Sequence, residues 1–384
     1  MSVSTRGWAL YNGLKYKGQI LNTSLPEKKL LGLEVLRFIS AMAILVFHYH
    51  QFAYVGLTLV NYQADQQPFY SLFKWFYLHG ELGVQFFWCI SGFIFFWKYQ
   101  NVIHQKIISG GKFFVLRISR LYPLHFATLL LIAALQIIYF REYGNYFVVH
   151  NNDLKHFILQ LFLASNWGGQ GFSFNAPIWS ISVEVLIYLF FFLVLRYVGK
   201  AVWVTLLVIL IGGLIKFNNL TESFIVDCII YFYLGGLTAQ IFKRFENTKY
   251  QKFILVFSLL VVISPLVLLN EDSFKQMKTI FLVIFAPALI YIAAMELKVS
   301  QKIGNLIEAL GNMTYSSYLI HLPLQLLIVL MLGALNITIP FYSSYFFIFY
   351  MALVLCLSRI IYLKYEKPMQ DFIRLRASNL KKVK

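Results

Sequence analysis

An arginine and a histidine, Arg37 and His48, stand eleven residues apart in an otherwise apolar stretch that runs from 31 to 50. Eleven residues make about three turns of α-helix, so both side chains fall on nearly one face, roughly 16 Å apart along the axis. Ionisable groups inside a membrane are costly and usually face a bundle interior or a water-filled cavity. We therefore predict that this stripe does chemistry: proton or acyl transfer by the imidazole, and polarisation of a reacting group by the guanidinium.

The composition is that of a membrane protein with many spans. Of the 384 residues, 59% are apolar and 13% are charged, whereas a soluble domain carries about a quarter charged residues. The 38 Phe and 25 Tyr suit lipid-facing helices with rings at the interface. We predict an all-α fold, a polytopic transmembrane helical bundle. The cysteines Cys89, Cys228 and Cys356 have no metal-like spacing, so we expect no metal and interpret all three as small core residues.

Ten apolar segments approach the length of about 20 residues that a bilayer-spanning helix needs. They cover residues 31–51, 80–99, 121–140, 178–198, 201–216, 222–242, 253–269, 279–297, 314–335 and 343–363. The fifth is cut short by Gly212, Gly213 and Lys216. The apolar segment 154–164 is too short to span, and we expect it to lie along the membrane interface.

Positive charge divides unevenly between the two sides of this topology. If the ten segments cross the membrane, 27 of the 33 Lys and Arg residues fall on one side. The positive-inside rule makes that side cytoplasmic, with both chain termini on it. Residues 1–30 then form a cytoplasmic N-terminal segment, 31–363 the transmembrane domain, and 364–384 a basic cytoplasmic tail. The formal net charge of +17 reflects this bias and attraction to the lipid bilayer, so no nucleic-acid partner is expected.

In this topology His48 and Glu184 share the outer half of the membrane. Glu184 lies six residues into a span that enters from outside, about 9 Å deep by helical rise. An imidazole and a carboxylate at one depth can form a base and the group that orients it. The alternative is that each is satisfied separately by a backbone carbonyl or water.

Two arginines on the cytoplasmic side suit a different chemistry. Arg117 and Arg120 are three residues apart, so they lie on neighbouring turns if the segment is helical. Guanidinium groups match phosphate oxygens, and nearby lysines add positive charge. The alternative is ordinary positive-inside anchoring of the chain.

Four further positions are candidates. Ser91 and Gly92 lie inside a span, where such a pair permits close helix contact or an opening in the backbone; Ser91 is either a packing residue or a catalytic one. His321, within the segment 314–335, has the same two interpretations. His125, at the basic end of the third span, contacts a phosphate or only reaches toward the interface.

Taken together, these segments resemble the acyltransferase-3 family of integral-membrane acyl-CoA transferases. The resemblance covers nearly the whole chain, and its motifs occur in the family's order. They are the stretch from Leu33 to Arg37 followed by His48, the stretch from Phe86 to Phe93, the pair Arg117 and Arg120, the stretch from Trp179 to Glu184 with Tyr188, and the stretch from Tyr318 to His321.

The resemblance implies transfer of an acyl group, commonly acetyl, from cytoplasmic acyl-CoA to a hydroxyl of an extracytoplasmic cell-surface polysaccharide or lipid-linked glycan. It implies that Arg37 and His48 are required and that Arg117 and Arg120 belong to the acyl-CoA side. It also implies a place in the cytoplasmic (inner) membrane. The sequence departs from the family in having Glu34 for the usual Asp, which keeps the charge, and Phe38 where a small Gly is common.

These interpretations together predict one mechanism. Acyl-CoA, as donor substrate, docks with its phosphates near the paired arginines, and we assign His125 and His321 to the same side. His48 acts as base on the acceptor hydroxyl or as a transient acyl carrier. Glu184 orients the imidazole, and Ser91 donates a hydrogen bond near the reacting carbonyl.

The role of Arg37 stays open among pairing with Glu34, closing an inner gate and polarising the thioester. Two other classes of protein also stay open: a transporter or flippase for a glycan-linked lipid, and a membrane sensor that binds acyl-CoA without turnover. No convincing internal repeat of the kind common in transporters is present.

Overall fold

The computed structural model describes residues 30–268 and 271–379, and these are mostly helical. Two strands, β1 (Tyr54–Val55) and β2 (Thr58–Leu59), pair antiparallel in an outer loop. Of the predicted N-terminal segment 1–30, all but Leu30 lies outside the described residues, as do the last five residues of the predicted tail.

Fourteen α-helices make up the described part of the chain. They are α2 (Leu31–His48), α3 (Tyr70–His79), α4 (Gly83–His104), α5 (Gly110–Tyr143), α6 (Leu154–Leu161), α7 (Ile178–Leu193), α8 (Val202–Phe217), α9 (Phe224–Phe245), α10 (Lys249–Leu268), α11 (Glu271–Ala293), α12 (Gln301–Asn312), α13 (Thr314–Ala334), α14 (Ser344–Ile361) and α15 (Lys367–Asn379). Short 3-10 turns cover Tyr49–Ala53, Ala64–Gln66 and Gly80–Leu82, and π-helical turns cover Val194–Val198 and Tyr362–Glu366.

The predicted all-α membrane bundle is confirmed in its class. Within the described residues, seven helices are long and apolar enough to cross a membrane, and two shorter apolar helices cover Val202–Phe217 and Leu282–Ala293. Each of the ten predicted segments overlaps a helix, whereas α3, α12 and α15 were not predicted. How many helices cross, and on which side the termini lie, stays a prediction.

Helices α4 and α9 pack backbone to backbone, which confirms the close-contact interpretation of Ser91 and Gly92. A Cβ atom added to Gly92 would lie 1.8 Å from the carbonyl oxygen of Phe232. Across the same contact, a Cβ on Gly235 would lie 1.8 Å from the carbonyl oxygen of Cys89. Two glycines, one on each helix, therefore bring these helices together, and α4 is held where Ser91 can face the interior.

The prediction for the cysteines is right for two of the three. Cys89 and Cys228 are buried, but Cys356 is exposed on α14. A helix side that faces lipid is as apolar as one that faces protein, so hydropathy does not distinguish them.

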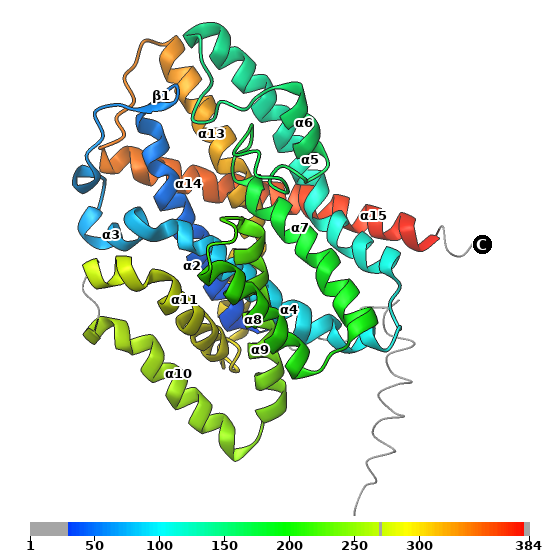
Figure 1. Cartoon of the computed structure of the whole chain (residues 1–384). Coiled ribbons are helices and arrows are strands. Elements are labelled where there is room, and N and C mark those ends of the chain that lie inside the picture. Colours follow the sequence, from blue (N-terminus) through cyan, green and yellow to red (C-terminus); the bar gives the residue numbers. More distant parts are fainter. Residues whose placement is uncertain (1–29, 269–270, 380–384) are drawn as a thin grey trace, which may run out of the picture.

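Figure 1 shows how the C-terminal helices reach the rest of the bundle. Helix α14, the π-helical turn and α15 form one long rod that runs across α5, while α10 and α11 pair at one side of the molecule. The predicted tail 364–384 is thus helical over most of its length and packs on α5.

Candidate active site

Five helices enclose a cavity of about 140 Å³ that holds most of the charged residues predicted from the sequence. Its polar lining comes from α2, α4, α5, α7 and α13. The residues are Arg37, Ser91, Arg117, Arg120, Ser180, Glu184, Tyr188, Thr314, Tyr315 and Tyr318. The structure thus brings Arg37, Ser91, Glu184 and the arginine pair together, although they come from four different helices.

Arg37 is fixed from two sides. Its Nη1 lies 2.8 Å from Oε2 of Glu34, one turn earlier on α2, and its Nη2 donates to Oγ1 of Thr314 at 3.1 Å. The side chain of Arg37 is only 12% exposed. Of the roles left open by the sequence, pairing with Glu34 is observed, and the guanidinium also faces the cavity.

Arg117 and Arg120 both lie on α5 and line the same cavity, as expected for neighbouring helical turns. Arg117 donates to the hydroxyl of Tyr99. Its guanidinium carbon lies 4.7 Å from the ring centre of Phe95 and 4.8 Å from that of Tyr99. Contact with aromatic faces holds a guanidinium flat while leaving its edge available for an anion.

Glu184 sits deep in this cavity rather than beside His48. The hydroxyls of Ser91 and Tyr188 hydrogen-bond to its carboxylate, and the positive charges of Arg120 and Arg117 act on it. The hydroxyls of Ser91 and Tyr188 are also 3.4 Å apart. A carboxylate, two hydroxyls and two guanidinium groups therefore form one polar cluster.

His48 is paired with a second histidine, and the predicted pairing with Glu184 is wrong. Nε2 of His321 lies 3.0 Å from Nδ1 of His48, and the two rings stack with centres 5.0 Å apart. The side-chain amide of Gln325 donates to the backbone carbonyl of His48 at 2.9 Å. Helices α2 and α13 pack side by side. His321, which is far away in sequence, therefore lies beside His48, where equal membrane depth had predicted Glu184.

The histidine pair and the cavity are neighbours but not one space. Neither His48 nor His321 is among the cavity-lining residues in the described part of the chain. Tyr318 lies between them: it lines the cavity, and its ring centre is 5.9 Å from that of His321. Its hydroxyl donates to the carbonyl of Pro177 at 2.9 Å, which fixes this partition.

His125, assigned from the sequence to the acyl-CoA side, lies elsewhere. It is fully buried in α5, and its Nε2 lies 2.7 Å from the carbonyl oxygen of Gln160 in α6. It is not among the described residues that line the cavity. This bond links α5 to α6, the helix that precedes the loop leading into α7.

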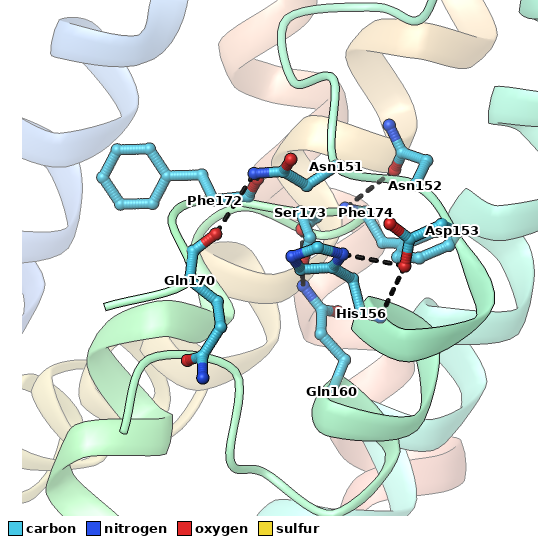
Figure 2. Close-up of polar contacts among 9 residues, drawn as sticks. All are labelled: Asn151, Asn152, Asp153, His156, Gln160, Gln170, Phe172, Ser173 and Phe174. Atoms are coloured by element: carbon cyan, nitrogen blue, oxygen red, sulfur yellow. Dashed lines mark hydrogen bonds and ion pairs between the residues drawn. The ribbon is translucent and has the colours of Figure 1, made fainter. Parts of the chain in front are cut away.

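That loop is held by a set of side-chain contacts drawn in Figure 2. Nδ2 of Asn151 donates to the carbonyls of Gln170 and Phe172, each at 3.2 Å, and Oδ1 of Asn152 accepts from the amide of Phe174 at 2.9 Å. Nε2 of Gln160 donates to Oγ of Ser173 at 3.1 Å. These bonds fix the chain just before α7, the helix that carries Glu184.

Asp153 caps α6 in the same loop. Its Oδ1 accepts from the backbone amide of His156 at 2.9 Å and lies 2.8 Å from Nδ1 of that ring. The hydrogen bond from the His156 amide, with the bond from its ring, lowers the pKa of the Asp153 carboxyl. A carboxyl whose folded pKa is lowered stabilises the fold above its unfolded pKa of about 4, and loses this effect as the pH falls through the folded value.

Replacing Asp153 by alanine is expected to lower the melting temperature in detergent by about 1–2 °C at pH 7, because an exposed helix cap is lost. The difference from wild type should persist at pH 5 and shrink below about pH 4. Thermal unfolding of both proteins across this range measures it. An equal difference at every pH would show that the charge of Asp153 has no part in the cap.

Two charged residues near the cavity escaped the sequence analysis. Glu366 is buried and accepts from Oγ of Ser316 at 2.5 Å. Arg374 on α15 donates to Oγ of Ser119 at 3.2 Å. One sequence feature could have indicated Glu366: it is a single glutamate between Lys364 and Lys367, directly after an apolar span.

Fold and site together define an integral-membrane helical protein whose interior carries arginines, hydroxyls and a histidine pair. The model of the acyltransferase-3 family, described as an acyltransferase domain, matches residues 30–363. The chain belongs to this family and is an acyltransferase.

One relative comes from Acidianus two-tailed virus and is named as a candidate acetyltransferase, ORF330. It is 24% identical over 282 residues, which are 69% of this chain and 79% of the viral protein. No solved structure matches the chain.

Proposed function

We propose that the protein transfers an acetyl group from acyl-CoA to a hydroxyl of an extracytoplasmic cell-surface glycan. The observation that carries this proposal is the joining of Arg37, Arg117 and Arg120 in one cavity whose wall, Tyr318, also touches the histidine pair. The uneven distribution of Lys and Arg supports ten spans, two cytoplasmic termini and a place in the cytoplasmic membrane.

The donor end of the reaction belongs to the arginine cavity. Its volume of about 140 Å³ is below the roughly 300 Å³ at which pockets begin to enclose a drug-sized ligand. It therefore suits the acyl-thioester end of the donor, while the nucleotide remains at the basic end of α5. Arg117 and Arg120 supply charge for phosphate or thioester oxygens, and Glu184, with Ser91 and Tyr188, orients these groups.

The acceptor end belongs to His48. As a base, its Nε2 takes the proton of the acceptor hydroxyl while the hydroxyl oxygen attacks the thioester carbonyl. The carbon–sulfur bond breaks, and the thiolate of CoA receives that proton. As a carrier, the same nitrogen attacks the thioester carbonyl and the CoA thiolate leaves; the acceptor oxygen then displaces the nitrogen from the acetyl carbon, and the hydroxyl proton goes to the thiolate. In either case the thioester in the arginine cavity and Nε2 of His48 must come together, although Tyr318 lies between the two sites.

Both versions need a free lone pair on Nε2 of His48, so its proton must sit on Nδ1 and be donated to His321. Nδ1 of His321 is buried and has no hydrogen-bond partner in the described part of the chain. A proton on that nitrogen leaves Nε2 of His321 as the acceptor. We therefore transfer the orienting role, first assigned to Glu184, to His321.

The experiment that tests this function is incubation of the purified protein with acetyl-CoA labelled in the acetyl group. Release of CoA with loss or transfer of the label supports the enzyme. Binding without turnover would favour a sensor, and the absence of both would favour a transporter. Mass analysis of surface glycans from cells with and without the gene then identifies the acceptor.

Replacing Arg120 by alanine is expected to weaken acetyl-CoA binding about tenfold, because a guanidinium facing phosphate or thioester oxygens is lost. The affinity of the wild type should fall more steeply with salt than that of the variant. Equilibrium binding of labelled acetyl-CoA at several salt concentrations measures both. Arg141→Ala, at the exposed far end of the same helix, is the control; equal affinity of the two variants would reduce Arg120 to an anchor.

A further inference from the structure

A buried carboxylate lies behind the arginine cavity, on a segment beyond the reach of the family match. Glu366 ends the π-helical turn Tyr362–Glu366 that joins α14 to α15, and the match ends at residue 363. Its side chain is only 3% exposed. Glutamate is almost never fully buried unless it is paired, so its partners indicate its role.

Those partners belong to the cavity wall. Oγ of Ser316, on the first turn of α13, donates to Oε2 of Glu366 at 2.5 Å. The charges of Arg120 and Arg37 favour the ionised form of this carboxylate. Both guanidinium groups line the cavity, whereas Glu366 is not among its described lining residues. The carboxylate thus acts on these arginines from the protein side.

Helix α15, which follows Glu366, is hydrogen-bonded to the part of α5 that carries Arg117 and Arg120. Arg374 on α15 donates through Nε to Oγ of Ser119 at 3.2 Å and through Nη2 to the carbonyl of Leu116 at 3.2 Å. These two acceptors flank Arg117 and lie just before Arg120 in the sequence. In Figure 1, α15 runs across α5. Tyr365, directly before Glu366, donates through its hydroxyl to the carbonyl of Pro123 on α5 at 3.1 Å, so Glu366 lies against the part of α5 that carries Arg120.

Electrostatics explain why a carboxylate is needed there. Arg37, Arg117 and Arg120 line one small cavity, and like charges repel strongly where water is scarce. Glu34 is committed to Arg37. Glu184 stands inside the cavity, where a bound anion would repel it. A carboxylate outside the lining offsets the charge of Arg120 without meeting the ligand.

We propose that Glu366 is a positioning residue of the donor site: fixed by Ser316, it holds the Arg120 guanidinium toward the acyl-CoA in the cavity. This inference rests on the proposed function, because it takes acyl-CoA as the ligand. It adds a residue from outside the matched domain to the site. It also makes the π-helical turn Tyr362–Glu366 part of the donor site.

The test compares Glu366→Gln with wild type, since glutamine keeps the shape and removes the charge. The Kd and KM for acetyl-CoA should rise about tenfold, with kcat changed less than about twofold, because the lost contribution acts equally on bound donor and transition state. Glu366→Asp should recover part of the affinity. Asp371→Asn is the matched control: it makes the same charge change on α15, in an ion pair with Lys367 whose members are 51% and 48% exposed, and should leave Kd unaltered.

A double-mutant cycle with Arg120→Ala then asks whether Glu366 acts through Arg120. In the Arg120→Ala background, Glu366→Gln should change Kd less than about twofold. Additive effects, or a Glu366→Gln variant that binds like Asp371→Asn, would overturn the proposal. If Glu366→Gln does not fold, Ser316→Ala takes its place: a Kd raised about threefold supports the proposal, and an unchanged Kd overturns it. Failure of wild type to bind acetyl-CoA would instead refute the proposed function.

Discussion

The His48→Ala variant is expected to lose acetyl transfer by a factor of about 10³ or more, with its affinity for acetyl-CoA nearly unchanged. A positioned general base contributes about 10²–10⁴-fold to a rate, and removal of a covalent carrier abolishes its route altogether. Affinity should survive because His48 is outside the described lining of the arginine cavity. CoA release in membranes that contain the native acceptor measures the rate, and equilibrium binding measures the affinity.

His50→Ala is the matched control for this variant. His50 lies two residues further along, and its Nδ1 is bound locally, 2.5 Å from the carbonyl oxygen of Phe47, so activity should be retained. Labelled acetyl trapped on His48 in the absence of acceptor would select the carrier over the base. Turnover at the wild-type rate in His48→Ala would remove this histidine from the chemistry.

The two mutational effects on the donor and acceptor ends should be separable. Arg120→Ala and Glu366→Gln raise the concentration of acetyl-CoA required, while His48→Ala lowers the rate at any concentration. Such a division is expected if donor binding and proton handling occupy neighbouring compartments with Tyr318 between them. A variant of Tyr318 would then affect both quantities.

The positions of the helices could be predicted because each long apolar run must satisfy its backbone internally. The stripe of Arg37 and His48 and the pair Arg117 and Arg120 could also be predicted, since helical spacing decides which side chains are neighbours on one helix. Helices α12 and α15 were missed because neither is an apolar run: one is amphipathic and the other is basic.

The partner of His48 could not be predicted, because it depends on which helices pack together. His321 is 273 residues away in sequence, and equal depth was the only guide to a partner. Depth favoured Glu184, yet the packing of α2 on α13 brings His321 closer. The same limit hid Glu366, whose role depends on a contact between the π-helical turn after α14 and the start of α13.

The largest effect on folding is expected from Gly92→Ala. Its new Cβ would lie 1.8 Å from the carbonyl oxygen of Phe232, about half the usual separation of about 3.5–4.0 Å between packed heavy atoms. The obstacle is backbone in a helix, so it cannot rotate away, and α4 must move off α9. Overpacking of a tight core costs about 1–3 kcal/mol or more. We expect a much lower yield of monodisperse protein and a melting temperature lower by several degrees.

Gly213→Ala is the control that separates this clash from the general effect of adding a methyl group. Nothing lies within 4 Å of a Cβ at Gly213 on α8, and alanine favours a helix over glycine by about 1 kcal/mol, so stability should hold or rise. Reaction of the buried thiols Cys89 and Cys228 with a dye on heating, in a Cys356→Ser background, measures unfolding. Gly235→Ala should repeat the Gly92 result, because it meets the carbonyl of Cys89 from the other side. If Gly92→Ala melts like Gly213→Ala, then α4 and α9 are not bound this closely, and Ser91 need not face Glu184.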